Sequence, residues 1–396
     1  MNTSTPRGPR DAVSWIVVGL IGAALAASSP VLADPTTAVL MRAQPLSHPS
    51  PMLLGDVQHT GISRHPGPRR GEVVWRANVP GGLLAPPSVD AQGQTWWVTQ
   101  AGALVVLDAD GGVLRRMAIG SGSHSVPALG RAGDVYTTDR DGRFMRLSPE
   151  GEVRWVTELE GETVSSPLLD EDGHRVIVSV EDRTIALDLD TGQPLFEFSF
   201  GNARYNSSPA LGPDGLVRIT NWDGWIAAIE PNGAARWKRR LARPGKIATP
   251  TLDAFGGLYT ALENGEVMGL TSKGRPLWIA RAPGPVLSFL AMLPDGRLIV
   301  PVATPGIQIV EPSGALGWYR PLDAGRLGFT VAVDRVGTIY YATAQGTIGA
   351  LDRDGEPVFA FETGAEFGAG PVIVPPRRGN PRAVIGALGG EIFCIE

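Results

Sequence analysis

Residues 207–237 read SSPALGPDGLVRITNWDGWIAAIEPNGAARW, one complete copy of a pattern that recurs along the chain. A Ser-x-Pro triplet is followed by Gly215, then by Gly224 and Gly233, and Trp237 stands four residues after the last of these glycines. Short runs of apolar and β-branched residues separate the glycines. Because glycine readily adopts the positive φ of tight hairpin turns, the stretch predicts four short strands joined by turns.

The pattern returns every 40–42 residues. Its first glycine recurs at Gly93, Gly133, Gly173, Gly215, Gly256, Gly296 and Gly337. Four residues after the third glycine of each period stands a large side chain, at Arg115, Trp155, Phe196, Trp237, Trp278, Trp318 and Phe359. Four strands in a period of this length are typical of a β-propeller blade.

The two ends of the chain complete the count of blades. Residues 371–395 supply three more strands, and Gly71 to Trp75 repeats the Gly-x3-Trp signature of an outermost strand. We therefore predict an all-β, eight-bladed propeller of four-stranded blades over residues 71–396, with the last blade closed by the N-terminal strand. Large rings on the outermost strands can pack into the next blade, and we predict this role for Trp75, Trp155, Phe196, Trp237, Trp278, Trp318 and Phe359.

The residues before the repeats have a different composition. An apolar run at 13–27 precedes a small-x-Ala pattern that ends at Ala33, so residues 1–33 are predicted to be a signal peptide cleaved near Ala33. An uncleaved signal anchor is the alternative. Residues 34–70 hold six prolines and almost no apolar periodicity, which predicts a disordered, Pro-rich lead-in. We expect the mature protein in the periplasm or secreted, without a transmembrane span.

A family resemblance rests on several short motifs. ALDLDTGQPLF at residues 186–196 resembles the Ala-x-Asp-x-x-Thr-Gly-x-x-x-Trp core of the pyrroloquinoline-quinone (PQQ)-type propeller repeat. Residues 106–111 and 350–355 are similar to it, and GDVQHTG at 55–61 resembles the segment that opens many exported proteins of this kind. The repeat is shared by quinoprotein dehydrogenases and the BamB outer-membrane assembly lipoprotein. The resemblance implies the propeller fold, with either function attached to it.

A PQQ-dependent dehydrogenase requires a particular cofactor site. Those enzymes hold the quinone on the propeller axis with Ca²⁺, usually beneath a disulfide between adjacent cysteines, whereas Cys394 is the only cysteine here. The even period also leaves little chain for a cofactor pocket. Four Asp-x-Asp-Gly tetrapeptides, at 108–111, 139–142, 170–173 and 352–355, lack the further ligands of a calcium loop and are predicted to be turns.

Binding residues are therefore sought in the loops. Loops between blades share one face with the turns between second and third strands, around the mouth of the central channel. Their least repeat-like members are predicted to bind an envelope protein, a peptide or a glycan: His124, Asp139, Arg140, Asp141, Arg204, Tyr205, Asn206, Trp222, Asp223, Arg243 and Lys246. An ordinary solvated rim is the alternative reading of the same residues. A net charge of −5 argues against nucleic acid as a partner.

These observations predict an exported, monomeric binding scaffold of the bacterial envelope, with no catalytic residue, metal or cofactor. A BamB-like role in outer-membrane protein assembly is its specific form. The enzymatic alternative is a minimal PQQ- and Ca²⁺-dependent dehydrogenase. A sensor or adhesion module tethered by the lead-in is a third hypothesis.

Overall fold

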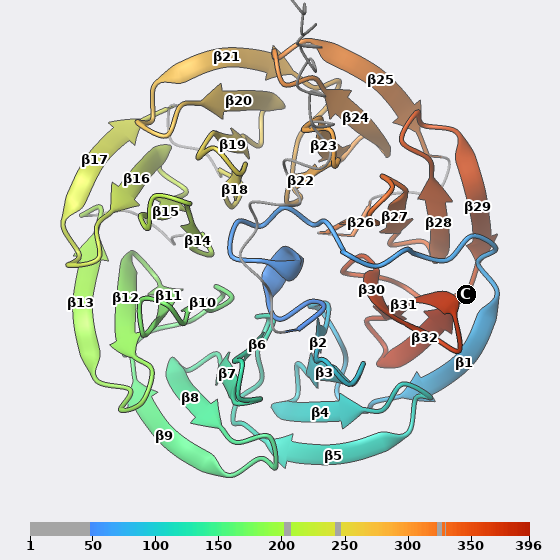
Figure 1. Cartoon of the computed structure of the whole chain (residues 1–396), viewed down its shortest axis with the longest axis horizontal. Coiled ribbons are helices and arrows are strands. Elements are labelled where there is room, and N and C mark those ends of the chain that lie inside the picture. The colour runs from blue at the N-terminus through green and yellow to red at the C-terminus, as the bar shows by residue number, and fades with distance from the viewer. Residues whose placement is uncertain (1–47, 202–206, 242–246, 323–326, 329) are drawn as a thin grey trace, which may run out of the picture. The chain divides into compact units, whose positions relative to one another are not determined.

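The computed structural model describes residues 48–201, 207–241, 247–322, 327–328 and 330–396. Contacts divide the chain into two units, Met1–Ala33 and Asp34–Glu396, and every described residue belongs to the second. This second unit is a ring of eight four-stranded antiparallel sheets around a central axis (Figure 1). The predicted fold class, an eight-bladed β-propeller, is confirmed.

Seven blades consist of four consecutive strands each, ordered from the axis outward. The first three are β2 (Ser88–Val89), β3 (Thr95–Val98), β4 (Ala103–Leu107) and β5 (Val113–Ala118); β6 (Ala128–Leu129), β7 (Val135–Thr138), β8 (Arg143–Leu147) and β9 (Val153–Glu158); and β10 (Leu168–Asp170), β11 (Arg175–Val180), β12 (Arg183–Asp188) and β13 (Pro194–Ser199). The fourth and fifth are β14 (Ala210–Leu211), β15 (Val217–Thr220), β16 (Trp225–Ile229) and β17 (Ala235–Arg240); and β18 (Thr251–Leu252), β19 (Leu258–Ala261), β20 (Glu266–Leu270) and β21 (Pro276–Arg281). The sixth and seventh are β22 (Ala291–Met292), β23 (Leu298–Val302), β24 (Gly306–Val310) and β25 (Leu316–Pro321); and β26 (Ala332–Val333), β27 (Ile339–Ala342), β28 (Thr347–Leu351) and β29 (Pro357–Glu362).

The eighth blade joins the two ends of the ring. It contains β30 (Val372–Arg377), β31 (Asn380–Gly386), β32 (Glu391–Ile395) and, as its outermost strand, β1 (Val73–Asn78). Trp75 stands opposite Cys394 in the β1–β32 pairing, and Glu72 and Glu396 exchange two backbone hydrogen bonds of 3.0 and 2.9 Å. The predicted closure of the last blade by the N-terminal strand is confirmed.

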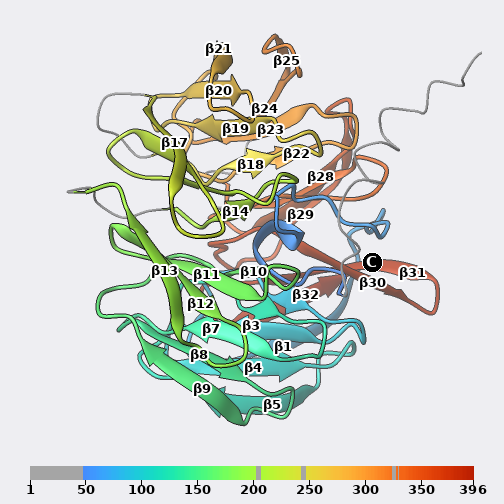
Figure 2. The same ribbon diagram turned by 60° about the vertical axis from the view of Figure 1, so that its left-hand side comes forward.

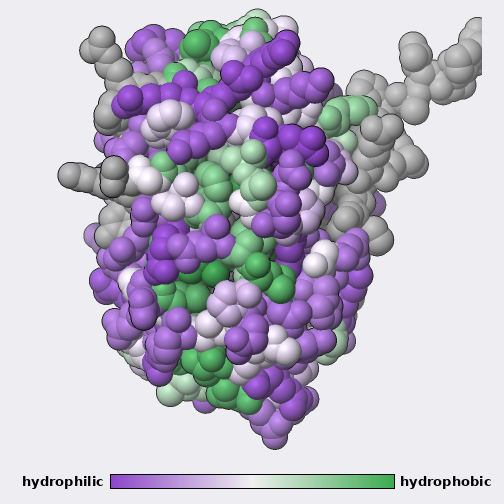
Figure 3. Space-filling view, turned by 90° about the vertical axis from the view of Figure 1, so that its left-hand side faces the viewer, coloured by the Kyte–Doolittle hydropathy of each residue, from purple (hydrophilic) through white to green (hydrophobic). Residues whose placement is uncertain are grey.

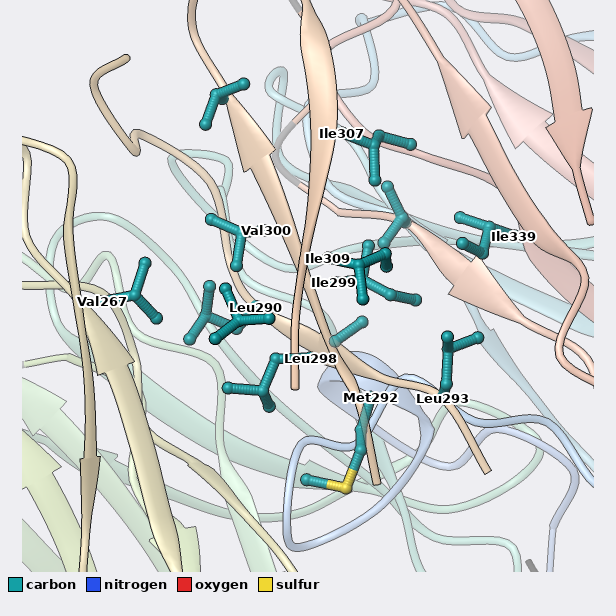
Figure 4. Close-up of a cluster of buried hydrophobic side chains, with 14 of the residues drawn as sticks. Val267, Leu290, Met292, Leu293, Leu298, Ile299, Val300, Ile307, Ile309 and Ile339 are labelled. Carbon is teal, nitrogen blue, oxygen red and sulfur yellow. The ribbon is translucent and has the colours of Figure 1, made fainter. Parts of the chain in front are cut away.

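The core lies within and between the blades. Second and third strands are buried on both faces, as in β23 and β24, whereas the outermost strands alternate between covered and exposed residues. Figure 4 shows side chains of neighbouring blades meeting in one apolar cluster, among them Val267, Leu290 and Ile339. Burial of each large aliphatic side chain contributes about 1.5–3 kcal/mol, so the joints between blades carry much of the stability.

The joints repeat one contact between an aromatic ring and a glycine. A Cβ placed on Gly274 would lie 2.6 Å from the Trp237 ring, and the Trp237 indole N–H donates to the Ser272 carbonyl at 3.1 Å. Only glycine leaves room for a ring at this distance, which explains the third glycine of the pattern. The same pairing recurs at Trp75–Gly111, Trp155–Gly192, Phe196–Gly233, Trp278–Gly314, Trp318–Gly355 and Phe359–Gly71.

The expected disordered lead-in is wrong for residues 48–62. They wind around the centre of the ring, past the inner strands of successive blades, and both views place their short 3₁₀ helix, η1 (Leu53–Gly55), inside the ring (Figure 1 and Figure 2). Backbone carbonyls of this axial segment accept hydrogen bonds of 2.7–2.9 Å from the inner strands of six blades. The donors are the amides of Val89, Leu129, Leu211, Leu252, Met292 and Val333, and the acceptors are Ser50, Pro51, Val57, Gln58, Thr60 and Gly61 in the same order.

This pairing explains why the sequence pattern misled. Any residue offers a backbone carbonyl as an acceptor, and five of the six acceptors are not proline, so the pairing leaves no periodic pattern of side chains in the sequence. Met52, Leu53, Leu54 and Ile62 are also buried and join the clusters of the surrounding blades. The predicted signal peptide and residues 34–47 lie outside the described residues.

Candidate functional site

An apolar cavity lies on the axis, among the loops that lead into the inner strands. It has a volume of about 320 Å³, and all eight blades contribute to its lining. Leu53 of the axial segment also lines it, so the chain's own N-terminal part contributes to the wall. Val164 is 38% exposed, which shows that this part of the lining is open to solvent.

The repeat itself builds this ring of residues. Ser166 and Ser208 each precede the proline that opens an inner strand, and both line the cavity. The Val126 amide donates to the Ser166 hydroxyl, and the Ser166 amide donates to the Ser208 hydroxyl, each at 3.0 Å. Hydroxyl groups thus link neighbouring blades around the axis and hold the cavity wall in place.

The described residues of the lining are uncharged. Among the described residues that line the cavity, there is no Asp, Glu, Lys or Arg; most are aliphatic, aromatic or hydroxyl-bearing. His124 is the one that titrates, and its pKa is lowered by burial and by the neighbouring Arg140. The imidazole is therefore neutral at pH 7, and the site suits an uncharged apolar group better than an ion.

The structure brings only some of the predicted binding residues together. His124 and Trp222 both line the axial cavity. Arg140 and Asp141 line a separate hollow, where Arg140 forms an ion pair of 3.5 Å with Glu162.

Two further predicted residues belong to turns. Asp139 has a buried side chain that accepts hydrogen bonds from the backbone amide and the side chain of Arg143 within its own turn. Asp223 lies in the turn between β15 and β16, where its amide donates to the Asn221 side chain at 3.1 Å. The remaining predictions, Arg204, Tyr205, Asn206, Arg243 and Lys246, fall outside the described residues.

Sequence reasoning missed the apolar part of the lining. Leu84, Val164, Leu287 and Phe289 line the cavity without full burial, together with the buried Leu53. The predicted binding residues were mostly polar, so these apolar residues were not among them. Alignment of the periods would have found four of the five, because they lie just before the inner strand of their blade.

The fold family raises the question of a quinone with Ca²⁺ at this position. PQQ is a tricarboxylate and needs cationic or amide partners, while Ca²⁺ needs carboxylate and carbonyl oxygens. The described lining offers no cation and no carboxylate, and nowhere in the described part of the chain do three His, Cys, Asp or Glu side chains gather as a metal site. The described lining residues therefore do not suit PQQ or Ca²⁺. Burial also raises the pKa of the Cys394 thiol to about 12, so this cysteine is unreactive at neutral pH.

Comparison with known proteins supports the propeller fold. A sequence profile of the family described as outer membrane protein assembly factor BamB matches residues 65–248. No curated protein sequence matches the chain significantly. In the described ranges, none of the helices has the length and apolar character needed to cross a membrane.

Solved structures of two kinds resemble the ring. BamB from Moraxella catarrhalis is 18% identical, with a TM-score of 0.66, over 82% of this chain and 99% of its own. Quinohemoprotein alcohol dehydrogenase from Comamonas testosteroni is 13% identical, with a TM-score of 0.74, over 91% and 84% of the two chains. The enzyme ADHIIG from Pseudomonas putida HK5 is 12% identical, with a TM-score of 0.73, over 91% and 81%. The chain is therefore an eight-bladed propeller that matches the BamB family model over residues 65–248 and has the fold that BamB shares with the quinohemoprotein dehydrogenases.

Proposed function

We propose that the protein is a non-catalytic, BamB-like binding scaffold of the bacterial envelope that holds an uncharged, apolar part of a protein partner in its axial cavity. The uncharged lining of that cavity, about 320 Å³ in volume, is the observation that carries the proposal. Such a volume accepts a few large apolar side chains of an inserted loop or strand end. Burial of each contributes about 1.5–3 kcal/mol, and two or three of them account for a specific but reversible complex.

The arrangement of the ring suits recognition without movement. Inner strands of six blades are tied to the axial segment by backbone hydrogen bonds, and hydroxyl groups link neighbouring blades. A cavity held from all sides is preorganised, so little binding energy is lost in ordering it. His124 and Trp222 supply a polar and an aromatic contact within it.

An unfolded outer-membrane strand is the partner that this chemistry favours. Such strands alternate apolar and polar residues and carry aromatic residues near their ends, so a strand end can place an aromatic ring in the cavity. The match to a family described as outer membrane protein assembly factors supports the same choice and an envelope location. The described lining residues, which carry no charge, suit an apolar group of a protein partner better than a tricarboxylate quinone.

A binding assay with a matched pair of variants tests this function. The probe is a fluorescent, capped and uncharged peptide of about ten residues that alternates aromatic and polar side chains, the length of one membrane strand. Val164→Glu places a charge at the cavity lining, whereas Val153→Glu makes the same change at an exposed site on β9. Because the side chains are 38% and 60% exposed in the native protein, neither change should disturb folding.

We expect saturable binding by the native protein and by Val153→Glu, and an affinity at least about tenfold lower for Val164→Glu, since a buried charge next to an apolar ligand is costly. No saturable binding by the native protein, or equal binding by the two variants, would overturn the assignment of the cavity.

A further inference from the structure

A second surface of the propeller, on its outer wall, differs from every equivalent surface of the repeat. Outermost strands point alternate residues toward the next blade and away from it, because side chains alternate along a strand. On β17, Trp237 faces the joint with the next blade, so Arg236, Lys238 and Arg240 lie on the opposite face of the strand, and all three are exposed. Lys238 donates to the Phe200 carbonyl at 2.7 Å, and the Lys238 and Arg240 cations lie 5.1 and 5.9 Å from the centroid of the Trp225 ring. Each outward position of this strand therefore carries a cation.

The other seven blades provide the baseline for this comparison. At the same three positions, each of their outer strands carries at most one cation. The residues are Val74, Arg76 and Asn78; Leu114, Arg116 and Ala118; Arg154, Val156 and Glu158; Leu195, Glu197 and Ser199; Leu277, Ile279 and Arg281; Gly317, Tyr319 and Pro321; and Val358, Ala360 and Glu362. Fold maintenance alone does not require cations at these positions, because seven blades fold without such a set.

The charge extends to the neighbouring blade. Arg239 donates to the Lys273 carbonyl at 3.4 Å, which places the exposed Lys273 and Arg275 of the turn before β21 beside β17. Two carboxylates pair with this surface, Glu230 with Arg236 at 2.9 Å and Glu266 with Arg281 at 2.8 Å. The seven basic residues of this surface are Arg236, Lys238, Arg239, Arg240, Lys273, Arg275 and Arg281, on a chain whose net charge is −5.

Two exposed apolar side chains stand on β21 between Arg275 and Arg281. Leu277 and Ile279 point outward from β21 and are 63% and 59% exposed, the values of side chains in open solvent. The neighbouring wall, seen in Figure 3, shows strongly hydrophilic residues interspersed with apolar ones. Cations beside exposed Leu and Ile are the combination that binds an anionic membrane surface, where the cations meet phosphate groups and the apolar side chains enter the headgroup layer.

We propose that this β17–β21 surface docks the propeller on a bilayer that contains anionic phospholipids. Docking through the outer wall leaves the axial cavity, which opens among the loops, free for a protein partner. The inference is independent of what the cavity holds, because it rests on a different face of the ring.

Flotation of residues 34–396 with lipid vesicles tests the docking. This unit contains all eight blades and their core. Vesicles of phosphatidylcholine with about one third phosphatidylglycerol are compared with pure phosphatidylcholine. The test variant is Arg236→Glu/Lys238→Glu/Arg240→Glu. The matched control, Arg76→Glu/Arg116→Glu/Arg154→Glu, makes the same change of net charge at outward positions of β1, β5 and β9.

We expect the native protein and the control to bind the anionic vesicles alike, and the test variant to bind about 100-fold more weakly, since each cation near an anionic surface strengthens binding several-fold. Leu277→Asn/Ile279→Asn should weaken binding about tenfold. Circular dichroism and thermal melting show whether each variant is folded.

Three results would overturn the proposal. The first is that the native protein binds both kinds of vesicle equally, or binds neither. The second is that the control loses as much affinity for anionic vesicles as the test variant. The third is binding of an acidic protein by this surface with no binding to vesicles. Because the peptide assay does not involve this surface, loss of one activity leaves the other measurable.

Discussion

The joints between blades and the axial segment hold the same ring together by opposite means. At seven of the eight joints, an aromatic ring fills the space above a glycine, as at Trp237–Gly274 and Trp318–Gly355, and at the eighth Met117 lies against Gly151. On the axis, residues 50–61 form backbone hydrogen bonds with six blades and have no repeat of their own. The joints use side chains that recur with the period, whereas the axis combines backbone hydrogen bonds with the buried side chains of Met52, Leu53, Leu54 and Ile62.

Residues that recur with the period hold the fold, whereas the candidate functional features lie elsewhere. Periodic positions are explained by packing and are shared by all blades. The axial segment and the cations of β17 do not recur from blade to blade, and the cavity is lined by residues that differ between equivalent positions of the period. Changes at the two regions should therefore have different consequences.

Removal of the axial segment should have the largest effect. A chain that begins at Arg64 loses four buried apolar side chains and leaves six inner-strand amides without their acceptors. The side chains alone contribute about 1.5–3 kcal/mol each, so a loss of more than about 6 kcal/mol, comparable to the stability of a whole domain, is expected. Urea unfolding, with a chain that begins at His48 as the control, measures the difference.

A synthetic peptide of residues 48–63 sharpens this test. If the segment acts as a closing element, the added peptide should restore stability to the shortened chain in proportion to its concentration. Equal unfolding midpoints for the chains that begin at His48 and Arg64 would show that the ring does not depend on its axis.

Acid should weaken the axis before it weakens the joints. His59 is buried, contacts the Pro250 carbonyl through Nδ1 at 3.3 Å, and burial lowers its pKa from 6.5 to about 4. The unfolded chain binds a proton near pH 6.5 and the folded chain only near pH 4, so this contribution to stability is complete above pH 6.5 and is lost as the pH falls toward 4. The loss at pH 4 is about 3 kcal/mol.

The His59→Asn variant isolates this effect, because asparagine does not titrate and tolerates the positive φ of 61° at this position. Its free energy of unfolding should vary less between pH 6.5 and 4 than that of the native protein. The pKa of Asp56, which burial raises, acts in the opposite direction and is common to both proteins. Parallel pH profiles of the two proteins would contradict the buried, neutral histidine.

A joint should respond to a single methyl group. Gly274→Ala would bring a Cβ within 2.6 Å of the Trp237 ring, whereas Gly215→Ala meets no atom within 4 Å; their φ values are +70° and +73°. Backbone strain of about 1 kcal/mol is then common to both, and the clash adds about 2 kcal/mol to Gly274→Ala alone. Equal urea midpoints for the two variants would show that the ring does not pack tightly on the glycine.

The sequence predicted the fold better than the site, for a physical reason. Turn glycines and joint rings such as Trp278 recur because every blade faces the same geometric problem, so their spacing reveals the number of blades. The pairing of Pro51 or Thr60 with an inner strand depends on backbone carbonyls, which no residue pattern reports. Polar residues drew attention to the loops, and of these His124 and Trp222 line the cavity, while the apolar Val164 and Phe289 resembled ordinary core residues.

The proposed function requires that the axial cavity bind an uncharged group. A calorimetric titration of residues 34–396 with PQQ in the presence of Ca²⁺ tests this requirement most directly. The lining described here predicts no saturable heat from a protein that circular dichroism shows to be folded. Saturable binding of one PQQ per chain at micromolar affinity or better would contradict the account and move the search to alcohol and sugar substrates.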